Sequence, residues 1–226
     1  MTGAAGQPSA PSSVHPNGIS SIGPREISRA RSAGMRMTVR SASVPTFQVA
    51  RTLDLAGGAE HSTYTPTEIL IAASARALHA CPAAHTCLID EAVHAYVETR
   101  VGLLVRRGDA LVPLVFERAE EVELADLRAD RTALQVQLRE GARLPASRTL
   151  APTFVISNLG QRRVDWFSAI LYPDTAVTLA AAGLGSGGLA PTQLRAVLTC
   201  DHRLVDGVDG ADFLEALQTA ITEIVQ

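Results

Sequence analysis

Apolar positions along the chain recur with two periods, one typical of strands and one typical of helices. Polar and apolar residues alternate over residues 44–53, which predicts a strand. From Pro66 to a point before Pro82, apolar residues recur every three or four positions, which predicts a helix. Thr65 is the expected N-cap of this helix, and Glu68 is expected to complete a capping box.

The rest of the chain continues this mixture of elements. Gly57-Gly58 breaks the chain after the first strand. A polar amphipathic helix is expected over about 121–140, with Gly141 as its C-cap. The remaining expected elements are strands at 92–105 and 110–116, joined by Arg107-Gly108-Asp109, further strands at 152–157, 175–182 and 194–200, and a last helix from about Asp209. Strands with helices laid over them predict an α/β fold, a two-layer sandwich of a mixed sheet and helices.

The N-terminal segment differs from the rest. Residues 1–24 are rich in Ser, Pro, Gly and Ala and lack any period, so a disordered arm is expected there. Residues 25–226 are expected to form one catalytic domain.

Composition narrows the class of protein. A formal net charge of -3 offers no basic field for nucleic acid. No apolar run approaches the roughly 20 residues that cross a bilayer, and the N-terminus lacks a signal-peptide core, so we expect a cytoplasmic protein with no membrane partner. Cys81, Cys87 and Cys200 are too few and too irregularly spaced for a disulfide framework or a zinc site, so buried inert thiols and no metal are expected.

All 20 basic residues are arginines. The sequence therefore offers no lysine for a Schiff base or a phosphate loop. It also offers no attachment point for lipoate or biotin, which are carried on lysine.

The most polar motif directly follows the last predicted strand and spans Asp201 to Gly207, with the sequence DHRLVDG. His202 has the right intrinsic pKa for a general base near neutral pH. Asp206, four residues after His202, is placed to orient or stabilise the groups around it. Gly207 permits a close approach of the backbone to another group, or a positive φ. The alternative is a polar strand end held by an ion pair, and the chemistry of the motif leaves both open.

This motif and two other blocks carry a resemblance to a known family. The second block is Thr153 to Gly160 (TFVISNLG), and the third, weaker one combines Met35-Arg36-Met37 with residues 44–47. In order and spacing they resemble the catalytic domain of 2-oxo acid dehydrogenase acyltransferases, the E2 components, over about residues 25–226. That family is similar in fold and chemistry to chloramphenicol acetyltransferase. Thr46 stands where the family usually has a histidine, which leaves the acceptor channel undefined.

The resemblance implies roles for the site residues. His202 would deprotonate the attacking thiol or hydroxyl, and Ser157 would donate a hydrogen bond to the oxyanion. The alternative for Ser157 is half of a turn-forming Ser-Asn pair with Asn158. Asp206 with Arg203 would hold the loop, and Asp201, Gly207 and Asn158 are expected to orient the site. Acyl-coenzyme A would be a substrate, the chain would form homotrimers or larger assemblies of trimers, and each site would be shared between two subunits.

Three functions are compatible with these features. The first is a stand-alone acyltransferase that moves an acetyl or acyl group between coenzyme A and a small-molecule or carrier-bound hydroxyl. Lipoyl-free E2-like proteins of tetronate-type polyketide biosynthesis act in this way, and the absence of lysine and of a lipoyl domain favours this choice. The second is the detached catalytic core of a dehydrogenase E2, a dihydrolipoamide acyltransferase. The third is a non-catalytic E2-like scaffold, which would not need His202, Ser157 and Asp206.

Three other features have simpler interpretations. His79, His85 and His94 lack ligand spacing and are expected at the surface or as partly buried structural residues. Trp166 is expected in the core. The glycine-rich run 183–188 precedes a strand instead of a helix, so we expect a loop between strands and no phosphate site.

Overall fold

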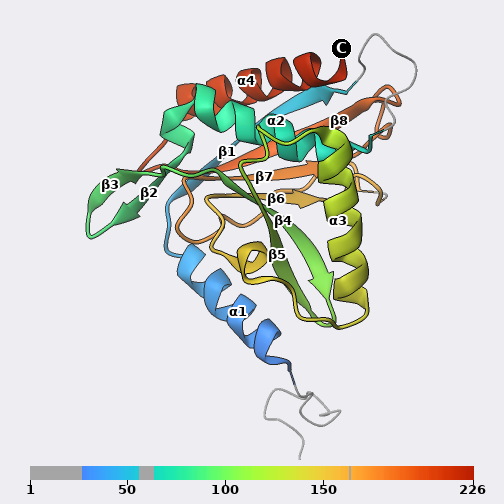
Figure 1. Cartoon of the computed structure of the whole chain (residues 1–226). Coiled ribbons are helices and arrows are strands. Elements are labelled where there is room, and N and C mark those ends of the chain that lie inside the picture. Colours follow the sequence, from blue (N-terminus) through green and yellow to red (C-terminus); the bar gives the residue numbers. More distant parts are fainter. Residues whose placement is uncertain (1–26, 56–63, 163) are drawn as a thin grey trace, which may run out of the picture.

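A six-stranded mixed sheet forms the centre of the protein in the computed structural model, which describes residues 27–55, 64–162 and 164–226 (Figure 1). The strand order is β1-β8-β7-β6-β4-β5, and β6 runs parallel to both β4 and β7, whereas the other pairs are antiparallel. Its strands are β1 (Thr46–Asp54), β4 (Arg100–Arg107), β5 (Ala110–Glu117), β6 (Phe154–Asn158), β7 (Val177–Ala182) and β8 (Gln193–Asp201). A separate two-stranded sheet, β2 (Thr86–Ile89) with β3 (Ala92–Ala95), projects to one side (Figure 1).

Helices form the second layer of this α/β sandwich. Helices α2 and α4 pack against each other over the β1 side of the sheet, α3 lies beside α2, and α1 lies against β5 (Figure 1). Their bounds are α1 (Arg29–Ser41), α2 (Pro66–Ala80), α3 (Leu124–Arg139) and α4 (Gly207–Val225), with short 3₁₀ turns at Pro82–Ala84 and Ala146–Thr149.

The hydrophobic core lies between the helices and one face of the sheet. Phe154 and Ile156 of β6 point into it, and Phe154 meets Phe213 of α4 with ring centroids 5.5 Å apart. Successive residues of a strand point to opposite faces, so Ser157 points away from α2, α3 and α4, which cover the core. A long crossover segment, residues 159–162 and 164–176, is attached to this second face. There the Thr199 hydroxyl donates to the Ala169 carbonyl at 2.7 Å.

Most of the predicted elements are confirmed. The first strand, the helix after Thr65, the hairpin through Arg107-Gly108-Asp109 and the last three strands all form close to their expected bounds. Gly141 follows α3 with φ +75°, the left-handed conformation expected of a glycine C-cap. The predicted fold class, a two-layer sandwich with a mixed sheet, is therefore correct.

Four predictions of local structure differ from the structure. The expected strand 92–105 is two strands, β3 and β4, and β3 pairs with β2, which was not predicted. Helix α1 was also missed, because its sequence RARSAGMRMTVRS has too few apolar residues to show a period. The capping box at Thr65 does not form, since the Thr65 hydroxyl bonds the Glu68 carboxylate instead of a backbone group. Helix α4 begins at Gly207, two residues earlier than expected.

The expected disordered arm over residues 1–24 and the chain break at Gly57-Gly58 lie outside the described residues. Within the described ranges, no helix combines the length and apolar character that crossing a membrane requires. The same ranges contain no cluster of three or more His, Cys, Asp or Glu side chains suited to a metal. Cys87 and Cys200 are buried, Cys81 is half-buried, and all three are free thiols.

Candidate active site

The His202 side chain lies on an exposed loop that follows β8. Its backbone N–H donates to the Pro45 carbonyl at 2.9 Å, so the loop remains attached to the start of β1. The imidazole lies against the Phe47 ring, with centroids 4.7 Å apart and planes tilted by 54°. Phe47 thus supports one side of the ring while the rest faces solvent, as an accessible base requires.

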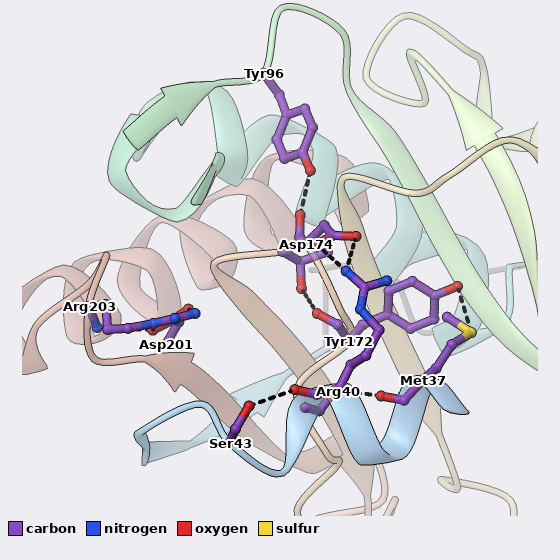
Figure 2. Close-up of polar contacts among 10 residues, drawn as sticks. Met37, Arg40, Ser43, Tyr96, Tyr172, Asp174, Asp201 and Arg203 are labelled. Carbon is purple, nitrogen blue, oxygen red and sulfur yellow. Dashed lines mark hydrogen bonds and ion pairs between the residues drawn. The ribbon is translucent and has the colours of Figure 1, made fainter. Parts of the chain in front are cut away.

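An ion pair within the motif fixes the loop. Asp201 is 3% exposed, and its two carboxylate oxygens accept from the Arg203 guanidinium at 2.9 and 2.7 Å (Figure 2). The Arg203 backbone N–H also donates to Asp201, at 3.0 Å. The hydrogen bond to Asp201 raises the pKa of Arg203 above its usual range. Arg203 was expected to hold the loop together with Asp206, but its partner is Asp201, because the tight turn brings residues 201 and 203 face to face.

Asp206 is the N-cap of α4. Its Oδ1 accepts from the backbone N–H groups of Val208 and Asp209 at 2.8 and 3.0 Å, and the Asp209 carboxylate accepts from the Asp206 N–H at 2.9 Å. The hydrogen bonds from Asp209 and Val208 lower the pKa of Asp206, and the nearby charge of His202 lowers it further. This capping box places α4 directly after the His202 loop, which Asp206 was expected to hold.

Gly207 does not have the role that the sequence indicated. It is the first residue of α4, its φ is not positive, and a Cβ built there would meet nothing within 4 Å. Neither a positive φ nor a close approach requires glycine at this position, because the first residue of a helix already has helical backbone angles.

Ser157 lies on β6, where it pairs with Ala180 of β7, and its side chain lines a cavity of about 580 Å³. Other walls of this cavity come from α1, from the β4–β5 hairpin and from residues 167–173, and they are mainly apolar; they include Met35, Leu111, Ile170 and Tyr172. No hydrogen bond of the Ser157 hydroxyl is found within the described part of the chain. The hydroxyl is therefore available to a ligand in the cavity.

Asn158, the next residue, forms the turn that ends β6. Its Nδ2 donates to the Thr67 hydroxyl at 3.2 Å, and its Oδ1 accepts from the Gly160 N–H at 2.8 Å. The turn-forming role considered for the Ser-Asn pair thus applies to Asn158, and Ser157 remains a strand residue.

Within one chain, Ser157 and His202 are far apart. Ser157 pairs with Ala180 of β7, and Ala180 pairs with Val197 of β8. Across the sheet, Ser157 is therefore aligned with Val197, which precedes His202 by five residues. Five residues of strand and two inter-strand spacings separate the two Cα atoms by roughly 20 Å. The fold therefore places the two predicted catalytic residues at different ends of the sheet, well beyond hydrogen-bond reach.

No local pattern in the sequence indicated the contacts that hold the wall of the Ser157 cavity. Asp174, whose φ is +62°, accepts from Arg40 of α1 at 2.8 and 3.0 Å, and its carbonyl accepts from the Tyr96 hydroxyl (Figure 2). At the other end of α1, the Ser28 N–H donates to Asp109 at 3.2 Å. Helix α1 is thus attached at both ends over the cavity, and the only hint of it was the Met35-Arg36-Met37 block in the resemblance.

Two further predictions concern residues outside this site. Trp166 is 61% exposed on the crossover segment, so its expected place in the core was wrong. His85 is buried and bonds the Thr153 hydroxyl at 3.0 Å, whereas His79 and His94 are exposed, which agrees with structural roles. Burial lowers the pKa of His85, which keeps that ring neutral.

Solved structures with a similar fold include those of acetyltransferases. A probable dihydrolipoamide acetyltransferase from Listeria monocytogenes superposes with a TM-score of 0.80 at 19% identity, covering 91% of this chain and 97% of that one. The cubic core of a pyruvate dehydrogenase multienzyme complex gives 0.78 at 21% identity, covering 90% and 93%. A chloramphenicol acetyltransferase gives 0.50 at 10% identity, covering 80% and 86%, which supports the expected likeness in fold.

Sequence comparison points the same way. The chain is 27% identical over 161 residues to the dihydrolipoyllysine-residue acetyltransferase component of the pyruvate dehydrogenase complex of Rickettsia bellii, covering 68% of this chain and 38% of that protein. It is 29% identical over 204 residues to component 5 of the chloroplastic complex of Arabidopsis thaliana, covering 83% and 43%. The chain thus spans about two fifths of the length of these relatives. The family model described as 2-oxoacid dehydrogenases acyltransferase (catalytic domain) matches residues 26–226, and the chain belongs to that family.

Proposed function

We propose that this domain transfers an acyl group between coenzyme A and the dithiol of a dihydrolipoyl group. The relatives are named as dihydrolipoyllysine-residue acetyltransferases, which supports the dihydrolipoyl group as the partner in the transfer. The observation that carries the proposal is that this member of the family has both groups that the reaction needs. His202 is exposed, and the Ser157 hydroxyl faces a large cavity without a hydrogen-bond partner in the described chain. Sequence alone favoured a hydroxyl acceptor of the tetronate type. The relatives favour the dithiol, so the order of the two candidates is reversed.

Each step assigns one task to one residue. His202 accepts the proton of the attacking thiol, and the sulfur then adds to the thioester carbonyl. The Ser157 hydroxyl donates a hydrogen bond to the tetrahedral oxyanion, an interaction worth about 3 kcal/mol of barrier. When the intermediate collapses, the leaving thiolate takes the proton back from the His202 imidazolium. The reaction consumes no other proton or electron.

The geometry of a single chain supports a site made by two subunits. The roughly 20 Å between Ser157 and His202 follows from the strand register and cannot be closed by a side-chain movement. A head-to-tail interface would bring the His202 loop of one subunit to the Ser157 cavity of the next, and such an interface closes into a ring. We propose a homotrimer, and trimers of this kind are suitable units for a larger core.

The Ser157 cavity suits an aliphatic arm. Its volume of about 580 Å³ falls in the range of small-molecule sites, and its walls are mainly apolar. A lipoyl arm or the acyl chain of a thioester would bury methylene groups there, each stabilising the complex by about 0.8 kcal/mol. The sequence contains no lysine, so the lipoyl group would be presented by a different polypeptide segment.

A competition assay separates the two acceptors. With acetyl-coenzyme A as donor, dihydrolipoamide and a primary alcohol such as a hydroxymethyl tetronate are offered together, and both products are quantified by mass spectrometry. The proposal expects the dithiol product to dominate. A strong preference for the alcohol would restore the stand-alone O-acyltransferase, and the absence of both products with every thioester donor tested would favour a scaffold.

A further inference from the structure

Asp174 lies in a turn where its residue type is unusual. The turn ends the crossover segment before β7, and across it the Thr175 N–H donates to the Tyr172 carbonyl at 3.3 Å. Pro173 at the second position and the φ of +62° at Asp174 are features of a type II turn, whose third residue is normally glycine or asparagine. Because a side chain makes the left-handed region less favourable, other contacts must stabilise Asp174 there.

Two segments that are distant in the chain supply these contacts (Figure 2). Nη2 of Arg40, at the C-terminal end of α1, donates to both carboxylate oxygens of Asp174 at 2.8 and 3.0 Å. The hydroxyl of Tyr96, which follows β3, donates to the Asp174 carbonyl. Burial raises the pKa of Tyr96, so this hydroxyl keeps its proton at neutral pH. Asp174 thus joins α1, the crossover segment and the end of the β2–β3 hairpin.

The Arg40–Asp174 ion pair lies beside the Ser157 cavity and does not line it. The direct neighbours of the pair, Ser41 on α1 and Pro173 on the crossover segment, do line it. The pair itself lines a smaller polar cavity of about 170 Å³. It therefore joins two walls of the Ser157 cavity from outside, and it can act on a ligand only through these walls.

Apolar burial contributes little to the position of α1. Among residues 29–41, only Ser41 is buried. At the other end of the helix, Ser28 accepts from the Arg31 N–H and donates to the Asp109 carboxylate in the β4–β5 turn. Each end of α1 is thus attached by a carboxylate to a segment that forms a wall of the Ser157 cavity. These attachments determine how closely the helix covers the cavity.

We propose that Asp174 is a positioning residue for the acyl transfer: its ion pair with Arg40 keeps α1 against the crossover segment and so sets the affinity of the Ser157 cavity for the uncharged dihydrolipoyl arm. This assignment rests on the proposed function and concerns a residue that touches no reacting atom. Both side chains of the pair are 60% exposed, and such a pair shifts an equilibrium by about fivefold at most. Its loss should therefore loosen the cavity wall without unfolding the protein.

Hydrogen exchange of the full chain tests the attachment without any turnover. Exchange of the α1 amides is followed by mass spectrometry in wild type, Asp174→Asn and Arg40→Gln, with Glu215→Gln as matched control. Glu215 forms an exposed ion pair with Arg51 on another part of the surface and does not line the cavity. We expect α1 to exchange about three- to fivefold faster in the two variants and at the wild-type rate in the control. Equal exchange in all four proteins overturns the proposal.

The affinity for dihydrolipoamide tests the consequence for the cavity. This ligand is uncharged, so salt should affect its binding through the ion pair. Titration calorimetry on the same proteins should give a dissociation constant about three- to fivefold higher in Asp174→Asn and Arg40→Gln than in wild type and the control. At about 1 M salt, where the Debye length is about 3 Å, wild type should approach the two variants, which themselves should respond little.

Two further variants separate positioning from folding. Glycine suits a φ of +62°, so Asp174→Gly should keep the unfolding midpoint within about 3 °C of wild type and yet bind dihydrolipoamide as weakly as Asp174→Asn. A single nitrogen of Arg40 donates to both carboxylate oxygens, so an ammonium group can replace it. Arg40→Lys should therefore bind the ligand as wild type does.

Kinetic constants complete the test. The KM for dihydrolipoamide should rise in Asp174→Asn, and kcat should change less than about twofold, because Ser157 and His202 are intact. The proposal is overturned if wild type does not bind dihydrolipoamide, if Asp174→Asn and Arg40→Gln bind it as the control does, or if kcat falls while KM stays unchanged. If exchange and affinity change as expected but no acyl product forms with any donor, the proposed function fails and the role of Asp174 at the cavity stands.

Discussion

At the scale of single residues, the structure separates groups that can react from groups that hold them in place. His202 and Ser157 are accessible and have no side-chain hydrogen bond in the described chain, whereas Asp201, Arg203 and Asp206 are held by hydrogen bonds within the loop and at the start of α4. Reactive groups need free positions for substrate, and positioning groups need fixed partners. This contrast distinguishes the residues that act on substrate from those that orient them.

Replacing His202 by alanine should lower kcat by about two to four orders of magnitude, the usual contribution of a positioned general base. The protein should remain folded, because the side chain is exposed and supports no core residue. The measurement is thiol release from acetyl-coenzyme A, with circular dichroism to check folding. His94→Ala, at an exposed position on β3, is the matched control, and a His202 variant as active as this control would exclude the assignment.

Replacing Ser157 by alanine should lower kcat about 100-fold and leave KM nearly unchanged, because the hydroxyl stabilises charge that exists only in the transition state. Steady-state kinetics with both substrates varied provide the two constants. Ser168→Ala, on the exposed crossover segment, controls for the loss of a hydroxyl. A variant with higher KM and normal kcat would show instead that Ser157 only binds substrate.

At the scale of elements, helix ends and one buried ion pair determine how the site is supported. Helix α4 begins two residues earlier than its apolar period indicates, because Asp206 and Asp209 cap each other's backbone. Helix α2 is joined to α3 through Glu68, which is fully buried, and Arg131, whose side chain is 13% exposed. Hydrogen bonds of single side chains therefore decide where α4 starts and how α2 packs against α3.

Loss of the Asp206 cap should destabilise the protein in a way that depends on the replacement. Asp206→Ala leaves two N–H groups of α4 without a partner and should lower the unfolding midpoint by about 2 to 4 °C, whereas Asp206→Asn keeps an acceptor and should lower it less. Thermal unfolding followed by circular dichroism measures both. Equal midpoints for the two variants would show that the charge of Asp206, and not its capping bonds, stabilises the fold.

The buried Glu68 carboxylate should make the free energy of unfolding depend on pH. Burial raises the pKa of Glu68, but hydrogen bonds from Thr65 and Arg131 outweigh burial and hold the pKa below its usual range. The stabilisation is therefore fully present above the unfolded pKa, about 4.3. It is lost as the pH falls through the lower folded pKa.

The comparison of wild type with Glu68→Gln isolates this effect. At pH 7 the variant should be less stable by about 3 kcal/mol, because a buried ion pair loses one charge and leaves Arg131 uncompensated. The difference should begin to shrink as the pH falls below the unfolded value of about 4.3, and it should be lost as the pH falls through the lower folded pKa of Glu68, where the native carboxylate becomes neutral. Urea unfolding at a series of pH values measures this difference, and a constant gap across the series would contradict the assignment.

At the scale of the whole molecule, the separation of Ser157 and His202 makes the proposed trimer part of the proposed mechanism. Trimers made only of Ser157→Ala chains, or only of His202→Ala chains, should be inactive, because every site lacks one of the two residues. Mixed trimers that contain both variants should regain activity. When Ser157→Ala and His202→Ala chains are unfolded, mixed one to one and refolded, about a quarter of head-to-tail interfaces should pair an intact Ser157 with an intact His202. About a quarter of wild-type activity should therefore return.

The complementation needs a demonstration that subunits mix. Native mass spectrometry of chains with different affinity tags shows whether heterotrimers form. If heterotrimers are present and the mixture stays as inactive as its parents, the two residues act within one chain and the estimate of their separation is wrong.

Much of the fold and part of the site follow from local features of the sequence. The periods of β1, α2, α3 and α4 and the turn at Arg107-Gly108-Asp109 are encoded within each segment, so they appear without tertiary information. The strand-end motif at residues 201–207 likewise contains its own ion pair and helix cap. The exceptions, α1 and the β2–β3 sheet, have little apolar period of their own and gain their structure from contacts at their ends or with each other.

The tertiary structure alone decided the relations between distant segments. Strand register sets the roughly 20 Å between Ser157 and His202, and no spacing along the chain encodes that value. A cavity of about 420 Å³ on the helix side of the sheet likewise collects side chains from β4, α3 and the loop after β6, which meet beyond the last β4–β6 pair, Leu103 with Ile156. Sequence thus determined which chemical groups this protein has and which local elements hold them. Packing of non-local strands and helices determined which of those groups share a site, because that depends on contacts between segments far apart in the chain.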